Sequence, residues 1–261
     1  NNTLDDNGGN IPGDGYTRSS ISVDYEYNAS WSDLSLTDDG EVNITYPFDF
    51  RFWGTDYTTS DAFRIGNNGG VLLDGTGDVD YGNLAMNNGS TPNNFLAAFW
   101  DDIDDNRGDV RGAIIGTTPN RRVVIAWNDR SHYNNSSSGG FWNLKFYEST
   151  NVIEYHYNDL DFGQAASNYG ASATIGIRKD ASNLDQYSYN TSVGTSPFAI
   201  RYTPVTLEDG AGLYVQSGTG TTVENNIFVA KSGDDDYYAL KTESGITVSS
   251  DYNTYYTGNT N

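Results

Sequence analysis

Cysteine is absent from this chain of 261 residues, and methionine, histidine and proline are scarce, with one Met, two His and six Pro. The lack of cysteine excludes disulfides, thiol nucleophiles and thiolate metal ligands. Apolar stretches last only a few residues, well short of the roughly 20 that a membrane-spanning helix requires. We therefore expect a chain that folds around its own core and does not insert into a membrane.

Basic residues are also few, since 14 Lys and Arg stand against 35 Asp and Glu and give a net charge of −21. This excess of negative charge repels phosphate backbones, so we expect no nucleic-acid partner. Carboxylates are instead suitable ligands for hard cations such as calcium. A composition rich in Asn, Gly, Thr and Tyr is typical of extracellular bacterial β-proteins. It predicts a secreted or cell-surface location, with a cytoplasmic origin as the alternative.

Apolar residues alternate with polar ones over residues 42–54, and no segment shows a helical period over twelve residues. The apolar positions are Val42, Ile44, Tyr46, Phe48, Phe50 and Phe52. Side chains of a strand point alternately to its two faces, so this pattern predicts one long strand with a buried face. Pro47 has no N–H to donate, which places it at a sheet edge or at a bulge.

Residues 110–157 predict a meander of four strands, and further apolar runs surround Ile175 and Ile200. Strands joined by short connections pair antiparallel, and two packed sheets bury the apolar face of each strand. We therefore expect an all-β fold in which an antiparallel β-sandwich occupies residues 16–205. Residues 1–15 hold hardly any apolar side chain, so we expect a linker or a docked tail there.

Residues 206–261 have a different texture, with very short apolar runs separated by Gly, Ser, Thr and Asn. The segment at 224–228 recurs in part at 251–255, an offset of 27 residues. Such an offset is typical of coils of a parallel β-helix, so we expect a partial β-helix or, as the alternative, a hairpin extension. A β-helix needs about three repeats for stability, so we expect the natural protein to continue beyond Asn261.

Several motifs follow one another in an order that resembles the nidogen-like domain of extracellular and bacterial surface proteins. They are the alternating segment 47–54, in which Trp53 replaces the usual Tyr, the Asn-Gly turn at 67–70, the FWDD segment at 99–102, the Trp strand at 124–129, and the segments 146–148 and 173–177. The resemblance implies an extracellular β-rich module that is usually joined to others, and it transfers no catalytic residue. The C-terminal piece resembles the β-helix segments of large secreted bacterial proteins.

Asp102, Asp104 and Asn106 have the D-x-D-x-N spacing of a calcium-binding loop. Arg107 stands where an EF-hand needs glycine and Ala113 where it needs a bidentate Glu, so the segment is not an EF-hand. It predicts either a looser calcium site or a solvated loop with Asp turns. Weaker candidates of the same kind are Asp74 with Asp78 and Asp80, and the run 234–236.

The ionisable residues of this sequence do not fall into known catalytic motifs. Neither His132 nor His156 lies near a serine elbow or an HExxH motif, and no glycine-rich segment continues as a phosphate loop. The many aromatic side chains suggest carbohydrate binding as a hypothesis. However, Trp127 and Trp142 are in phase with apolar neighbours and are expected in the core. We therefore expect a protein that is not an enzyme.

These observations predict a non-enzymatic structural or adhesive module of a secreted or cell-surface multidomain protein. Its partner would be a cell-surface protein, a glycan or another copy of itself. One alternative is an accessory region of a polysaccharide-degrading enzyme, in which the β-helix part would carry the chemistry. Such lyases use a Lys or Arg as the base, and the scarcity of these residues after residue 206, where only Lys231 and Lys241 occur, argues against it. Another is a subunit of an extracellular filament, which would assemble through exposed strand edges.

Overall fold

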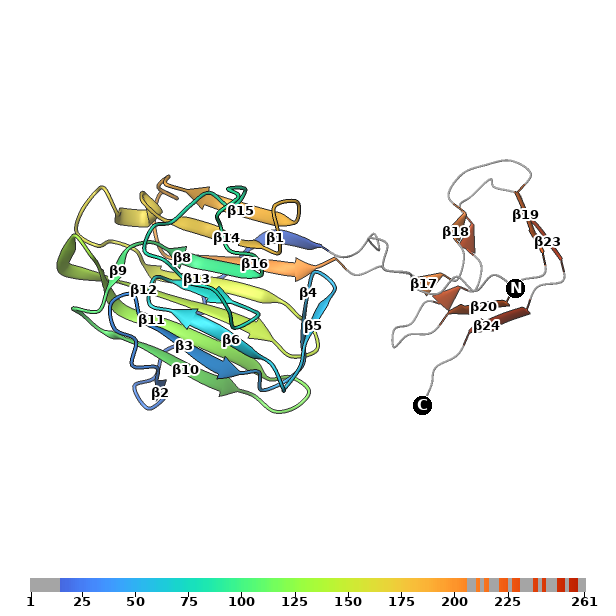
Figure 1. The fold of residues 1–261 in the computed structure, drawn as a ribbon, viewed down its shortest axis with the longest axis horizontal. Coiled ribbons are helices and arrows are strands. Elements are labelled where there is room, and N and C mark those ends of the chain that lie inside the picture. Colours follow the sequence, from blue (N-terminus) through green and yellow to red (C-terminus); the bar gives the residue numbers. More distant parts are fainter. Residues whose placement is uncertain are drawn as a thin grey trace. The chain divides into compact units, whose positions relative to one another are not determined.

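The computed structural model describes residues 15–205 in full and eight short strands between residues 210 and 257. The chain forms two compact units, Gly15–Val205 and the combination of Asn1–Asp14 with Thr206–Asn261 (Figure 1). Among the described residues, no helix is long and apolar enough to cross a membrane. A single 3₁₀ turn, Asn168–Gly170, is the helical element of the described sandwich.

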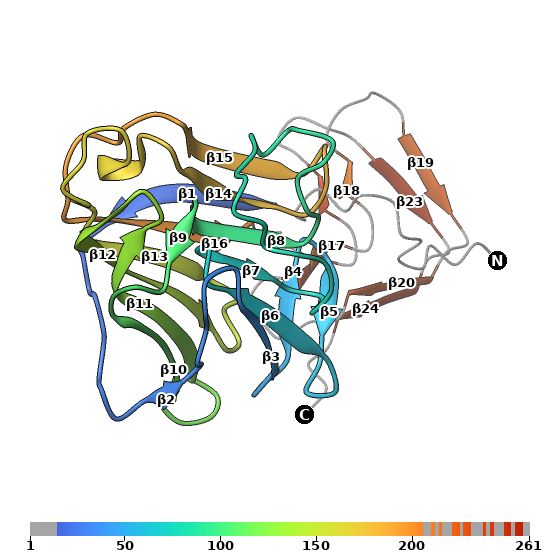
Figure 2. The same cartoon turned by 60° about the vertical axis from the view of Figure 1, so that its left-hand side comes forward.

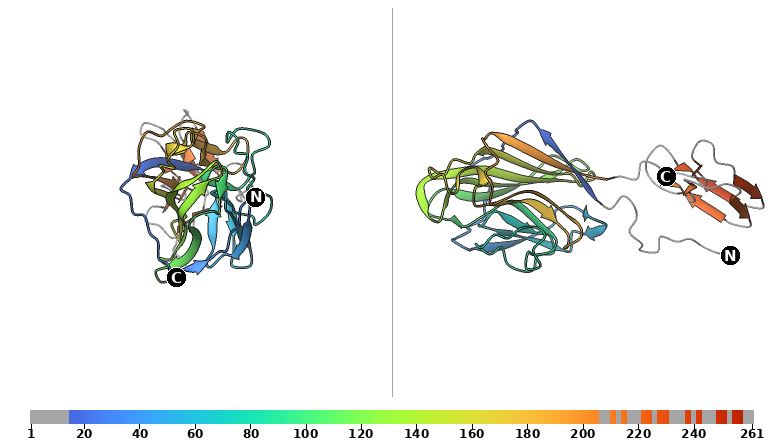
Figure 3. Two further views of the ribbon diagram at one scale, coloured as in Figure 1. Left: turned by 90° about the vertical axis from the view of Figure 1, so that its left-hand side faces the viewer. Right: turned by 90° about the horizontal axis from the view of Figure 1, so that it is seen from above.

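Two antiparallel sheets pack face to face in the unit Gly15–Val205, and the right-hand view of Figure 3 shows the two layers. The eight-stranded sheet has the order β1 (Tyr16–Ile21), β16 (Phe198–Pro204), β13 (Ile153–Asp159), β12 (Asn135–Tyr147), β11 (Arg122–His132), β10 (Asp109–Ile115) and β2 (Ser32–Asp33), with β9 (Ile103–Asp104) also on β11. The six-stranded sheet has the order β15 (Leu184–Tyr189), β14 (Thr174–Arg178), β8 (Phe95–Trp100), β7 (Gly70–Leu72), β6 (Ala62–Gly66) and β3 (Glu41–Thr45). The predicted antiparallel β-sandwich is confirmed.

The core between the sheets is largely aromatic. Trp127 and Trp142 lie on adjacent strands with their rings stacked 5.7 Å apart, and neither side chain is exposed. Phe146 packs against aromatic rings from the other side of the sandwich, which are Tyr46, Phe48, Phe50 and Phe63. The prediction that Trp127 and Trp142 belong to the core is therefore confirmed.

The predicted long strand over residues 42–54 is two strands. β3 ends at Thr45, and β4 (Phe50–Phe52) forms a hairpin with β5 (Thr55–Tyr57). Pro47 lies in the break, where its missing N–H costs no ladder hydrogen bond. The even-numbered apolar residues point towards the core on both sides of the break. Val42 and Ile44 are only half-buried, because β3 is the last strand of its sheet.

The predicted meander is present as β10, β11, β12 and β13, which neighbour one another in that order. Residues 135–140 are small and polar, NSSSGG, yet they belong to β12. They extend the pairing with β11 across two register shifts, beyond the segment where the side chains alternate. Backbone pairing therefore continues where the sequence pattern has ended.

The first and last strands of the sandwich lie side by side. β1 pairs antiparallel with β16 from Tyr16↔Pro204 to Ile21↔Ala199. Just outside this pair, the Val205 N–H donates to the Gly15 carbonyl at 2.9 Å. The chain therefore enters and leaves the sandwich at the same point, as Figure 1 shows at the start of β1 and the end of β16.

The strands after residue 206 form four parallel pairs. They are β17 (Gly210–Ala211) with β21 (Tyr237–Tyr238), β18 (Tyr214–Val215) with β22 (Lys241–Thr242), β19 (Thr221–Glu224) with β23 (Val248–Asp251), and β20 (Ile227–Ala230) with β24 (Thr254–Thr257). Every pair joins residues 27 positions apart, from Gly210↔Tyr237 to Ile227↔Thr254. The offset seen in the sequence is thus the register of all four pairs.

Candidate functional site

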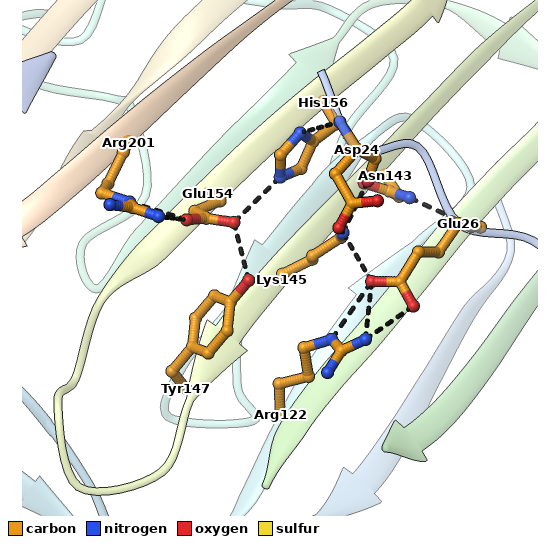
Figure 4. Close-up of polar contacts among 9 residues, drawn as sticks. All are labelled: Asp24, Glu26, Arg122, Asn143, Lys145, Tyr147, Glu154, His156 and Arg201. Atoms are coloured by element: carbon orange, nitrogen blue, oxygen red, sulfur yellow. Dashed lines mark hydrogen bonds and ion pairs between the residues drawn. The ribbon is translucent and has the colours of Figure 1, made fainter. Parts of the chain in front are cut away.

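A network of charged and polar side chains covers the outer face of the eight-stranded sheet (Figure 4). Residues 22–27, here called the strap, lie between β1 and β2 and contact this face. Alternation sends Trp142, Leu144 and Phe146 of β12 into the core, so Asn143 and Lys145 point outward to the strap. The strap thereby shields polar side chains that the outer face of a sheet would otherwise expose to water.

Lys145 lies at the centre of one half of the network. Its side chain is completely buried, and its Nζ lies 2.9 Å from Asp24 Oδ2 and 2.5 Å from Glu26 Oε1. Arg122 of β11 binds both oxygens of Glu26. The hydrogen bond from Lys145 lowers the pKa of Asp24. Burial acts against the ionised form of Glu26, but hydrogen bonds from Arg122 and Lys145 lower its pKa.

Glu154 of β13 is the centre of the other half, with only 4% of its side chain exposed. Tyr147 donates its hydroxyl at 2.7 Å, His156 contacts the carboxylate through Nε2 at 2.9 Å, and Arg201 donates Nε–H at 2.7 Å. Burial opposes ionisation, yet the hydrogen bonds from His156, Tyr147 and Arg201 lower the pKa of Glu154 to about 2. Glu154 is therefore a carboxylate whose charge is fully matched by donors.

His156 joins Glu154 to the strap. Its Nδ1 accepts the backbone N–H of Asp24 at 3.0 Å, so the ring proton resides on Nε2 and is donated to Glu154. Both nitrogens of His156 are thus engaged by protein groups. The network fastens the strap to β11, β12 and β13, and its chemistry is that of structural ion pairing.

The predicted calcium ligands lie in and around β9. Asp104 is buried, its Oδ1 accepts the backbone N–H of Asn106 at 3.0 Å, and the Asn106 side-chain amide donates to its other oxygen. Burial raises the pKa of Asp102 to about 6, with His132 acting against this and Asp101 adding to it. The structure thus brings Asp104 and Asn106 together in a local turn, whereas the carboxylates whose charge acts on Asp102 are those of Asp101, Asp39 and Asp38.

The described residues contain no group of three or more His, Asp or Glu side chains placed to hold a metal ion. Asp74 bonds to Thr76 and Asp80 to Gly82, each as the acceptor of a local turn. The run 234–236 lies outside the described residues. Asn106 turns its Nδ2 towards Asp104, and an amide ligates a cation through its oxygen. Calcium binding by Asp102, Asp104 and Asn106 would therefore require the Asn106 amide to turn over, and it stays a prediction.

A thermal melt with calcium and with a chelator tests this prediction. If these three residues bind the ion, calcium raises the midpoint, since a ligand at 100 times its dissociation constant stabilises the native state by about 2.7 kcal/mol. Asp102→Asn should abolish the shift. Asp56→Asn is the matched control, because Asp56 lies elsewhere with 65% of its side chain exposed. An unchanged midpoint in the parent chain rules out the site.

An apolar groove opens on one side of the sandwich, with a volume of about 170 Å³. It is lined by Ser32, Leu34, Ile44, Pro47, Phe63, Ile65, Gly112, Ala113, Ile114, Val123 and Ile125. None of these side chains is ionisable. They come from β2, β3, β6, β10 and β11 and from Leu34 and Pro47, which follow β2 and β3. Figure 2 shows β3 and β10 along the same lower side of the molecule. The groove therefore lies at this side of the sandwich, between β3 and β6 of one sheet and β2, β10 and β11 of the other.

A protein-family model described as NIDO related matches residues 15–216 of the chain. The match begins at the first residue of the sandwich and runs through its last. The chain belongs to the NIDO-related family. The nidogen-like resemblance of the sequence motifs is thereby confirmed, and such domains are typically extracellular, in agreement with the predicted location. Searches of curated proteins and of solved structures found no match.

Sequence reasoning missed two features of the NIDO-related domain, the strap network and the apolar groove. The outward residues Asn143, Lys145 and Tyr147 alternate with the core residues of β12 and offered a signal for the network. The strap's carboxylates gave none, because Asp24 lies 121 residues from Lys145. The groove depends on which strands end the two sheets, and no local pattern specifies that.

Proposed function

We propose that this NIDO-related chain is a non-enzymatic adhesive or structural module of a secreted or cell-surface multidomain protein. The observation that carries the proposal is the apolar groove, whose lining includes no ionisable side chain. Catalytic pockets bring titratable groups together, whereas a groove of apolar side chains offers only burial to a ligand. The charged groups of the strap network are bonded to one another and to the strap.

The adjacent ends of the sandwich support adhesion over a load-bearing role. Gly15 and Val205 are bonded to each other, so tension carried by the main chain would separate β1 from β16 one pair at a time. A domain whose two ends are adjacent can be inserted in a longer chain as a side domain that presents its surface to a partner. We therefore propose that the sandwich presents a binding surface and does not transmit force along its parent protein.

For the C-terminal unit we propose the beginning of a parallel β-helix. The support is the single 27-residue register of four parallel pairs, because a hairpin would pair neighbouring strands antiparallel. In a β-helix each coil stacks on the preceding one, so a constant offset is expected for every strand. In this arrangement the adhesive sandwich would be followed in the chain by a repeat array.

Binding and turnover assays with polysaccharides test the proposed function. The full chain is incubated with a panel of polysaccharides while release of reducing sugar is measured, and the same chain is applied to arrays of glycans and of cell-surface proteins. We expect saturable binding on an array and no sugar release. Sugar release above that of the heat-denatured chain would overturn the proposal in favour of a polysaccharide-degrading enzyme. No binding on any array would overturn the adhesive role.

A further inference from the structure

We propose that the apolar groove binds an extended segment of a partner protein as an added β-strand, with apolar side chains at alternate positions and basic side chains between them. The inference deepens the proposed adhesive function and rests on it. Three properties of the groove carry it: free backbone edges, an uncovered apolar wall and a negatively charged rim.

Within residues 15–205, the first free edge belongs to β3, which ends the six-stranded sheet. The Tyr46 N–H donates to Asp61 and the Gly40 carbonyl accepts from Asn67, so the even-numbered residues of this segment turn their backbone groups towards β6. Successive residues of a strand point these groups to opposite sides. The N–H and C=O groups of Asn43 and Thr45 therefore point away from the sheet, where an added strand would lie.

The second free edge belongs to β10. The Val110 carbonyl accepts from the Leu34 N–H. The backbone N–H and C=O groups of Val110, and of every second residue after it, therefore point away from β11, towards the edge of the sheet. β2 covers this side only at Arg111 and Gly112. The backbone groups of Ile114 therefore lie on an edge that no described strand pairs with. An extended peptide next to either edge can form main-chain hydrogen bonds, which supply affinity in β-augmentation.

The apolar wall between these edges is incompletely covered. Val110 and Ile114 lie on the same face of β10, yet Val110 is 1% exposed and Ile114 is 56% exposed. Ile44 of β3 and Leu34 are half-buried. A cavity of about 170 Å³ is smaller than the 300–1,000 Å³ typical of small-molecule sites. It has room for one or two apolar side chains projecting from one face of a strand.

The opposite side of the sandwich, where β1 and β15 end the two sheets, is closed by side-chain contacts. Arg18 of β1 forms an ion pair with Asp185 of β15, and its guanidinium lies over the ring of Tyr187. Tyr187 in turn stacks on Phe198 of β16. Side chains of the domain itself thus bridge the sheets there, and the β3 and β10 side has an apolar groove instead.

Charge decides which occupant fits. Asp33 stands between the lining residues Ser32 and Leu34, and it shares the guanidinium of Arg111 with Asp109, so this cluster of two carboxylates and one cation keeps a net negative charge. Asp61, which is exposed, precedes β6 and holds the end of β3 through its carbonyl. A second copy of a chain with a net charge of −21 would be repelled. A peptide with Lys or Arg at its outward positions complements this rim.

Binding of synthetic peptides to the full chain tests the proposal by fluorescence anisotropy. The probe is a labelled peptide of about ten residues in which Val and Lys alternate. The comparison peptides have the same composition in two blocks, or Glu in place of Lys. We expect the alternating Val and Lys peptide to bind more tightly than either by about tenfold or more, which is about 1.4 kcal/mol. Equal affinity for the block peptide would show charge attraction alone and overturn the proposal.

Two variants locate the binding. Ile114→Asn makes the exposed wall polar, and Gly112→Val fills the groove, since a Cβ at Gly112 meets Leu34 at an ordinary 3.5 Å. Each should weaken the probe about tenfold, while Tyr81→Asn, at a residue 58% exposed, should not. Unchanged affinity in both groove variants overturns the proposal. The proposal is also overturned if sedimentation shows that the parent chain self-associates and that Ile114→Asn abolishes this, because the groove would then bind a second copy of the chain. A failure of this proposal would not change the results of the polysaccharide and array assays. It can therefore be distinguished from a failure of the proposed adhesive function.

Discussion

Pulling the sandwich by its two adjacent ends is expected to unfold it at several-fold lower force than pulling the same two strands along their axes. β1 and β16 are paired over six register positions, from Tyr16↔Pro204 to Ile21↔Ala199. Force applied at Gly15 and Val205 loads the first pair alone and then the next. Force applied at opposite ends of the two strands loads all six pairs at once, so more contacts must break together.

Cysteine handles make this comparison direct, because the chain has no cysteine of its own. Gly15→Cys with Val205→Cys gives the peeling geometry, and Gly15→Cys with Thr195→Cys gives the shearing geometry. Thr195 is exposed and precedes the start of β16, and a Cβ at Gly15 meets Val205 at an ordinary 3.7 Å. Single-molecule force spectroscopy reports how fast the native contacts break under load. Equal forces in the two geometries would contradict the interpretation of the sandwich as a side domain.

Removing the Glu154 carboxylate is expected to cause the largest loss of stability among single substitutions in the strap network. Glu154→Leu leaves Tyr147, His156 and Arg201 without their shared acceptor. Breaking a buried ion pair from one side costs about 3–5 kcal/mol of the free energy of unfolding. The expected loss lies at the lower end of this range, because 45% of the Arg201 side chain is exposed. Asp56→Asn is the control. It breaks a pair with Arg51 in which both side chains are about half exposed or more, and such pairs contribute at most about 1 kcal/mol.

The same residue makes stability depend on pH. The pKa of Glu154 falls from 4.5 to about 2 on folding, so the folded state binds its proton more weakly than the unfolded state. The resulting stabilisation is present above about pH 4.5 and is lost as the pH falls towards 2. After allowance for solvent screening it amounts to about 2 kcal/mol.

Chemical denaturation between pH 7 and pH 2.5 measures both effects of Glu154. The parent chain should lose this increment as the pH falls, whereas Glu154→Gln should lack it because an amide does not titrate. A Glu154→Leu variant as stable as the parent at pH 7 would show that the network does not fasten the strap. A parallel fall in the parent and Glu154→Gln would assign the acid sensitivity to other carboxylates.

Local patterns predicted those parts of the fold that depend on which way a side chain points. The alternation around Trp127 and Trp142 placed both rings in the core, and the order of the meander followed from its short connections. The offset of 27 residues, visible in the sequence, is the register of the C-terminal strand pairs. The predicted strand at 42–54 was wrong in its continuity, since Pro47 divides it although the apolar phase continues.

The sequence by itself determined the all-β class, the aromatic core and the family, because alternation and motif order are properties of neighbouring residues. The tertiary structure alone decided that Asp24 meets Lys145 across 121 positions. It also decided that β3 ends one sheet on the same side where β10, only partly covered by β2, lies in the other, with an apolar groove between them. Both features depend on contacts between distant segments. Such contacts are selected by the packing of the whole sandwich, and no stretch of sequence carries them alone.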